Sequence, residues 1–155
     1  MIAAAFKRIW SRMFPSAAAP RRDARVARGP NTVVTGAVEF RRPGSVAIGA
    51  DCTIGAKIYV NTEKAEVRIG DNVSIGGGTI IESAVGIAIH SDVLISYQCI
   101  LQDSNNHSLR LSERIHDNLN WNRRGQHDWR LPVSAPVVVG RGCWIGARAI
   151  ILKGV

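Results

Sequence analysis

The sequence predicts an all-β parallel solenoid whose coil has three flat sides, each formed by one six-residue repeat. Aliphatic residues recur at every sixth position through most of the chain after Phe40. A glycine often follows the aliphatic residue, and a small or aliphatic side chain usually stands four positions after it. A period of six suits neither a helix nor a stack of hairpins, whereas a solenoid stacks such inward side chains in apolar ladders.

The chain has 155 residues, of which 46% are hydrophobic, enough for one domain with a sizeable core. We divide it into a basic helix and linker over residues 1–30 and a β-solenoid domain over residues 31–155. Residues 1–14 place apolar side chains at helical spacing among three basic ones, and Pro15 ends the run. This amphipathic helix suits an anionic membrane surface, or packing on its own domain or a neighbouring subunit. The sequence leaves both roles open.

The net charge of +8 is concentrated at one end, because residues 1–30 hold seven basic side chains and a single acidic one. A nucleic-acid-binding domain spreads basic residues over its folded face, so the charge argues against a nucleic-acid partner. No stretch of 18 apolar residues predicts a membrane span. Three cysteines without a CxxC pair favour a reducing compartment. We therefore expect a cytoplasmic protein, with the basic helix as the segment that would reach the inner face of a membrane.

The solenoid is predicted from four sets of inward residues. They are Ile48, Ile54 and Val60; Ile69, Ile75 and Ile81; Ile89, Ile95 and Leu101; and Val139, Ile145 and Ile151. Cys52, Cys99 and Cys143 occupy the slot four positions later, so we expect all three as buried filler rather than as nucleophiles. Extra residues follow the third repeat of each coil, and the largest insertion is a loop over residues 102–138. All insertions should emerge at one corner, the usual place of a binding face.

The pattern breaks at the stretch QDSNNHS, where His107 stands in place of the next inward aliphatic residue. The three residues before it are Ser, Asn and Asn, which an apolar ladder would not accept. The chain must therefore leave the coil here, with a histidine at the lip of the corner.

Three motifs, IGDNVSIG, QDSNNHS and GRGCWIGARAIILKGV, together resemble the hexapeptide-repeat acyltransferases. The resemblance covers roughly residues 40–155 and is closest to the sugar and polysaccharide O-acetyltransferases. It implies a left-handed parallel β-helix, a homotrimer, and direct acetyl transfer from acetyl-CoA to a hydroxyl of a sugar or polysaccharide acceptor. Acetyl-CoA is then the co-substrate, and no metal is expected.

The resemblance also implies roles for individual residues. His107 matches the general base of the family, a role that suits neutral imidazole. Asp103, four residues earlier, would orient the ring or remain a solvated carboxylate in a turn. Trp144 matches a tryptophan beside the acyl-donor groove, and Gly146, two residues later, is expected at the same groove. The backbone N–H of Ala147 matches the donor aimed at the thioester oxygen in the transition state.

Acceptor contacts are expected from Glu82, Ser83, Asn105, Trp121 and Trp129. Glu82 and Ser83 leave the sheet just before the same corner, roughly where the family keeps acceptor-binding groups. Trp121 and Trp129 lie among five arginines in residues 108–134. Such an aromatic and basic lid suits a sugar face or the phosphates of coenzyme A, and it equally suits packing against a neighbouring coil or subunit.

Two other interpretations share the scaffold. Zinc carbonic anhydrases built on the same helix need three histidine ligands, and His90, His107, His116 and His127 supply enough imidazoles but no repeating ligand spacing. A non-catalytic β-helix used for assembly at a membrane surface has no reason to keep a corner histidine with polar neighbours. The resembled family continues with further coils after residues 139–155. We therefore expect a C-terminally truncated form that binds coenzyme A poorly.

Overall fold

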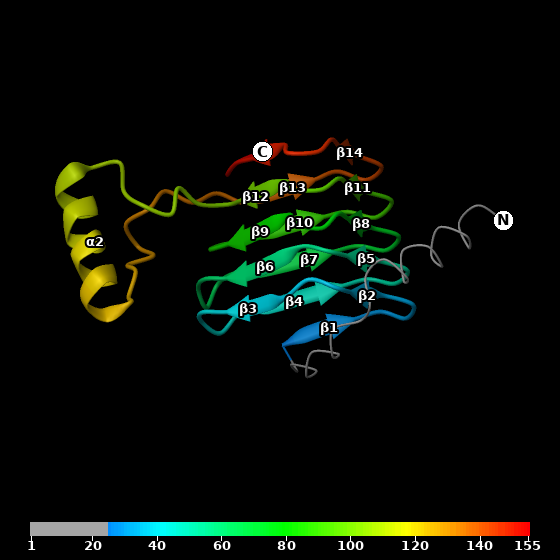
Figure 1. Ribbon diagram of the computed structural model, residues 1–155, viewed down its shortest axis with the longest axis horizontal. Coiled ribbons are helices and arrows are strands. Elements are labelled where there is room, and N and C mark those ends of the chain that lie inside the picture. The colour runs from blue at the N-terminus through cyan, green and yellow to red at the C-terminus, as the bar shows by residue number, and fades with distance from the viewer. Residues whose placement is uncertain (1–24) are drawn as a thin grey trace.

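The computed structural model describes residues 25–155, which form fifteen strands and one helix. The strands stack into a three-sided prism, and the helix stands to one side of it (Figure 1). The predicted basic helix over residues 1–14 lies outside the described residues. Within residues 25–155, no helix has both the length and the apolar character needed to cross a membrane.

Each side of the prism is a parallel sheet, with five strands in the described part of the chain. The first sheet contains β1 (Val26–Arg28), β4 (Ser45–Ile48), β7 (Glu66–Ile69), β10 (Ile87–Ile89) and β13 (Val137–Val139). The second contains β2 (Val33–Val34), β5 (Thr53–Ile54), β8 (Ser74–Ile75), β11 (Leu94–Ile95) and β14 (Trp144–Ile145). The third contains β3 (Val38–Phe40), β6 (Lys57–Val60), β9 (Ile80–Ser83), β12 (Ile100–Gln102) and β15 (Ile150–Ile151).

Consecutive strands belong to three different sheets, and each strand pairs with the strand three places further along the chain. This is the predicted parallel β-helix, and the arrangement is consistent with the left-handed form. The solenoid begins earlier than predicted, because β1 pairs with β4 in the first sheet. Residues 26–28 therefore belong to the first coil and not to the linker.

Inward side chains form the apolar ladders that the six-residue period predicts. The first sheet aligns Ile48, Ile69, Ile89 and Val139, and the second aligns Ile54, Ile75, Ile95 and Ile145. All of them are buried except Ile145, which is partly buried against the same core. Each fully buried isoleucine or leucine stabilises the fold by roughly 1.5–3 kcal/mol. The fully buried side chains therefore lie mainly in the inner coils, whereas Val34, Phe40, Ile145 and Ile151 of the outermost described coils are partly buried.

The third ladder differs from the prediction in the second coil. Ile58, rather than Val60, pairs in register with Ile81, and Val60 pairs with Ser83. This coil passes from the second to the third side with two residues fewer than the next coil, where Gly78 occupies the left-handed region at the corner. Irregular spacing therefore occurs at two corners. The prediction of a single irregular corner is wrong, because Ile58 and Val60 are both buried aliphatic residues and the sequence suits either register.

The corner between the first and second sheets is the same in every described coil. One residue there adopts the left-handed region, and these residues are Asn31, Asp51, Asn72, Asp92 and Gly142. Asn, Asp and Gly adopt this conformation most readily. The Asn72 amide donates to Asp92 Oδ1 at 2.8 Å, so the corner residues also bond from coil to coil. Each described coil therefore turns this corner with the same spacing.

The three cysteines do not share one environment. Cys52 and Cys99 are buried as predicted, whereas Cys143 is exposed. Cys143 lies in the coil of β13–β15, and no further coil of the described residues packs on its open side. The prediction of a buried thiol is therefore wrong for Cys143.

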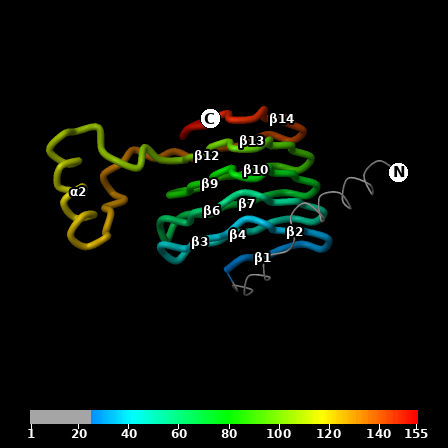
Figure 2. The backbone as a smooth tube through the Cα atoms, viewed as in Figure 1, coloured from blue at the N-terminus to red at the C-terminus, as the bar shows by residue number. Residues whose placement is uncertain are grey.

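The long insertion leaves the prism after β12 and returns at β13 (Figure 2). It is not the plain loop predicted over residues 102–138, because it contains the helix α2 (Leu111–Arg124). Ser108 donates to Glu113 in the first turn of α2. Gly125, with φ of 61°, ends the helix in the left-handed region that favours glycine.

Candidate active site

A cleft of about 660 Å³ lies where the insertion meets the corner that follows the third sheet. The prism contributes one wall from residues at the ends of successive third-side strands: Arg41 and Arg42, Asn61, Glu82, and Asn106 with His107. The insertion contributes the other wall: Asn118, Trp121, Gly125, Gln126, His127 and Trp129. Stacking of the coils therefore aligns residues distant in the sequence along one wall.

Asp117, on α2, joins two histidines at this cleft. Its Oδ2 atom lies 2.9 Å from His107 Nδ1 and 2.8 Å from His127 Nδ1. The Asp117 side chain is 1% exposed, that of His127 is 10% exposed and that of His107 is 58% exposed. A carboxylate at this distance accepts a hydrogen bond from Nδ1–H, which leaves the lone pair of a neutral imidazole on Nε2. We call His107, Asp117 and His127 the histidine triad. His107 therefore offers a proton-accepting nitrogen at the exposed side of this triad.

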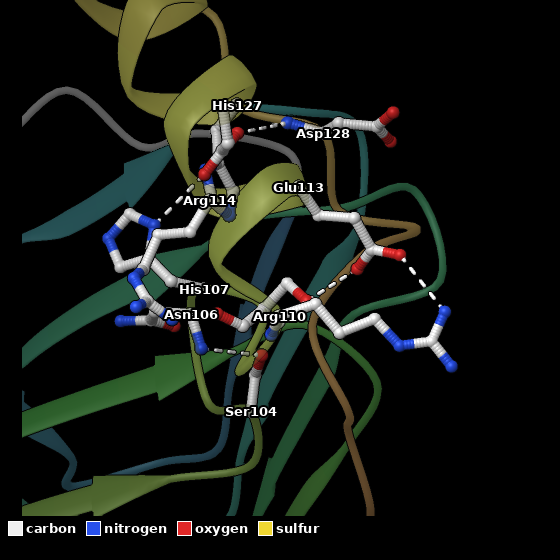
Figure 3. Close-up of polar contacts among 10 residues, drawn as sticks. Ser104, Asn106, His107, Arg110, Glu113, Arg114, His127 and Asp128 are labelled. Atoms are coloured by element: carbon white, nitrogen blue, oxygen red, sulfur yellow. Dashed lines mark hydrogen bonds and ion pairs between the residues drawn. The ribbon is translucent and has the colours of Figure 1, made fainter.

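The segment after α2, which includes His127 and Asp128 (Figure 3), bonds to Asp117 and holds it in place. Asp117 Oδ1 accepts a hydrogen bond from the backbone N–H of Asp128 at 3.2 Å. Arg130 donates to both carboxylate oxygens of Asp128, at 2.8 and 2.7 Å, and these bonds lower the pKa of Asp128 to about 2. The His127 ring stands edge-on to His107, with centroids 5.0 Å apart, and packs similarly on Trp129 at 4.6 Å. Together these contacts fix the orientation of the His107 ring.

Asp103 does not orient His107, contrary to the expectation. It is fully buried, and its carboxylate accepts hydrogen bonds from Ser83 Oγ and from the backbone N–H groups of residues 84–86. The reason is its register, because Asp103 stands two residues after the inward Leu101 and so also faces inward. Asp103 closes the turn of the coil below. Ser83 is buried in the same contact, so its expected contact with an acceptor is wrong too.

Glu82 lines the cleft and bonds to amides on both neighbouring coils. Its Oε1 accepts from Asn61 Nδ2 at 2.9 Å, and its Oε2 accepts from Asn106 Nδ2 at 3.0 Å. The Oδ1 atoms of Asn61 and Asn106 are buried and have no hydrogen-bond partner among the described residues. Asn105 does not line the cleft. Its backbone N–H donates to the carbonyl oxygen of Val133 at the root of the insertion.

The expected aromatic and donor residues divide between two places. Trp121 and Trp129 line the cleft. Trp144, Gly146 and Ala147 lie at or near the corner between β14 and β15, and none of them lines the cleft. Trp144 is 78% exposed. One chain therefore does not bring the expected acyl-donor residues to His107.

His107, Asp117 and His127 could also hold a metal ion, since their ligand atoms all lie within 4.8 Å of one another. Two imidazoles and one carboxylate suit several divalent metals. The three-histidine set of the zinc carbonic anhydrases does not form within residues 25–155, because His90 and His116 lie outside this group. The observed contacts of 2.8 and 2.9 Å are those of charge-assisted hydrogen bonds.

A family model described as the hexapeptide repeat of succinyl-transferase matches residues 66–96 and 136–155. The match supports the hexapeptide-repeat family. Both matched segments are coils of the prism, and the insertion with the histidine triad lies between them. The family supports a transferase-like function of the acyltransferase type. Searches of curated proteins and of solved structures found no match.

Proposed function

We propose that the protein is an O-acetyltransferase that moves an acetyl group from acetyl-CoA to a hydroxyl of a sugar or polysaccharide, with His107 as the general base. The observation that carries this proposal is the 2.9 Å contact between His107 and the buried Asp117 in the cleft. A hydroxyl is a poor nucleophile until a base takes its proton, and an imidazole fixed in one tautomer performs this task.

In the proposed reaction the acceptor hydroxyl lies in the cleft and donates to His107 Nε2. The nitrogen takes the proton as the oxygen attacks the thioester carbonyl, and Asp117 stabilises the imidazolium that forms. The carbon–sulfur bond then breaks, and the proton passes from His107 to the departing thiolate. The products are the acetyl ester and coenzyme A, and His107 returns to its neutral form.

The acyl donor requires a second subunit in this proposal. Trp144, Gly146 and Ala147 lie at a corner of the prism different from that of His107. A homotrimer would bring this corner of one subunit against the cleft of the next. The Ala147 backbone N–H would then donate to the oxygen on which negative charge develops, and the exposed Trp144 ring would flank the donor.

The test compares His107→Ala with His116→Ala, an exposed histidine of α2 that lies outside the cleft. Release of the coenzyme A thiol is measured with a panel of glycosides as acceptors. We expect His107→Ala to lower the transfer rate by about 100-fold or more, and His116→Ala to leave it unchanged. Both variants should melt like the parent, since neither side chain belongs to the core. Near-parent activity of a folded His107→Ala protein would refute the role of His107.

A further inference from the structure

We propose that the acceptor is an anionic oligosaccharide, and that Arg42 binds a carboxylate or phosphate group on a sugar beyond the one that is acetylated. This inference rests on the proposed function, because it names the acceptor class of the same cleft. Two observations support it, namely the positive charge of Arg42 at the cleft wall and the separation of Arg42 from His107.

Two arginines line the cleft, and they differ in how their charge is used. The guanidinium of Arg41 lies 4.8 Å from the ring centroid of Tyr59 and 3.8 Å from Glu82 Oε1. The Arg42 guanidinium makes no hydrogen bond or ion pair within residues 25–155, although Arg42 lines the same cleft. Arg42 therefore offers an uncommitted cation to a ligand.

The acidic side chain in the cleft wall does not neutralise Arg42. Glu82 accepts hydrogen bonds from three amides, those of Asn61, Gln102 and Asn106, and its remaining ion pair is with Arg41. Asp117 is buried behind the histidines and does not line the cleft. A free guanidinium beside satisfied polar groups selects an anion, and it binds carboxylate or phosphate through two parallel hydrogen bonds.

The position of Arg42 implies a ligand longer than one sugar ring. Arg42 follows β3 and His107 follows β12, which are separated in the third sheet by β6 and β9. Three steps between neighbouring strands amount to about 14 Å along the prism. The anionic group should therefore belong to a sugar one or two units away from the reacting hydroxyl.

The wall between these two positions suits a carbohydrate. Asn61, Glu82 and Asn106 form a hydrogen-bonded row of polar side chains along this wall. Trp121, which is half exposed, and Trp129 offer flat apolar surfaces on the opposite wall. A cleft of about 660 Å³ has room for more than a single sugar ring.

Binding is tested separately from transfer, by calorimetry with two matched pairs of ligands. The first pair is tri-galacturonic acid and its fully methyl-esterified form, which differ in charge and share one skeleton. The second pair is maltotriose phosphate and maltotriose, which tests phosphate in place of carboxylate. The parent protein should bind at least one anionic member about tenfold more tightly than its neutral partner. This preference should weaken as salt is raised.

Arg42→Gln should abolish the preference, whereas Arg28→Gln, which removes an exposed charge of β1 outside the cleft, should preserve it. Equal binding of charged and neutral ligands by the parent protein would overturn the inference, as would a preference that survives Arg42→Gln. Loss of coenzyme A binding in Arg42→Gln, with trisaccharide binding unchanged, would assign Arg42 to the acyl donor and would also overturn it. Charge-dependent binding without transfer to any sugar would instead refute the proposed activity.

Discussion

The prism and its insertion are held together by different interactions. In the prism, aliphatic ladders of isoleucine, valine and leucine fill the interior, and nearly all of their side chains are fully buried. In α2 (Leu111–Arg124) the one buried residue of the described helix is Asp117, and its contacts are polar. The repetitive region therefore carries the stability, and the inserted region carries the reactive groups.

These two kinds of contact explain why the candidate site lies where the insertion meets the prism. The stacked coils form a rigid wall, because each coil contributes a residue at the same corner. The insertion has few apolar contacts and so belongs to the part of the chain that opens most easily. The charged groups of a site are tolerated there, whereas they would disrupt an apolar ladder.

The largest effect is expected at Asp103, where the two regions join. Asp103→Ala leaves several buried donors without an acceptor, and we expect a loss of about 4 kcal/mol in the free energy of unfolding. The measurement is urea denaturation. The control is Asp71→Ala, which removes an exposed carboxylate beside a coil corner that accepts from the backbone N–H of Ala50 and should cost about 1 kcal/mol. Similar losses for the two variants would mean that Asp103 is no stronger a link than a surface corner.

A pair of leucine variants compares the interiors of the two regions. Leu101→Ala removes a fully buried side chain of the third ladder and should cost about 3 kcal/mol. Leu119→Ala alters a side chain of α2 that is 41% exposed and should change the stability by less than about 0.5 kcal/mol. Both values come from the same urea experiment. A large loss from Leu119→Ala would show that α2 packs on a partner that stabilises it.

The fold was predictable because the six-residue period directly records which side chains face inward. Ile69, Ile75 and Ile81 lie in the ladders where the spacing placed them. The error at Val60 has a physical cause, since strands alternate inward and outward and a shift of two residues preserves the inward face. The preference of the corner residues for left-handed backbone, as at Asp51 and Asn72, is a second repeat that could have fixed the register.

The site was less predictable, because its key partner lies outside the repeat. His107 was found from the break in the period, but Asp117 belongs to a helix with no repeated neighbour to mark it. The helix itself had signals that were missed, namely Glu113 in its first turn, Arg123 and Arg124 in its last turn, and Gly125 after it. Which face of such a helix turns inward depends on tertiary contacts that sequence spacing does not encode.

The role of the insertion in the chemistry is tested by Asp117→Asn. An asparagine cannot stabilise an imidazolium and no longer enforces one tautomer of His107, so we expect the transfer rate to fall at least about tenfold. The stability of the prism should remain that of the parent. The control is Glu113→Gln, which removes an equal charge from α2 that bonds to Ser108 and Arg110 and to neither histidine of the triad. Equal rate losses for the two variants would mean that the rate depends on the net charge of the insertion and not on the contact between Asp117 and His107.

The smallest expected effect lies at the outer edge of the insertion, where Arg130 lowers the pKa of Asp128 to about 2. Because the folded pKa lies below the ordinary value of 3.8, the pair contributes stability above pH 4 and loses it as the pH falls toward 2. Arg130→Gln should return the pKa of Asp128 toward 3.8, which a carboxyl NMR titration detects. The pair is largely solvent-exposed, so the stability change at neutral pH should be below about 1 kcal/mol.

Hydrogen exchange at the Asp128 amide, which bonds to Asp117, should accelerate in Arg130→Gln while exchange in β9 and β12 stays constant. If exchange in those strands accelerated as well, the insertion and the prism would open together, and the separation between the two regions would be wrong.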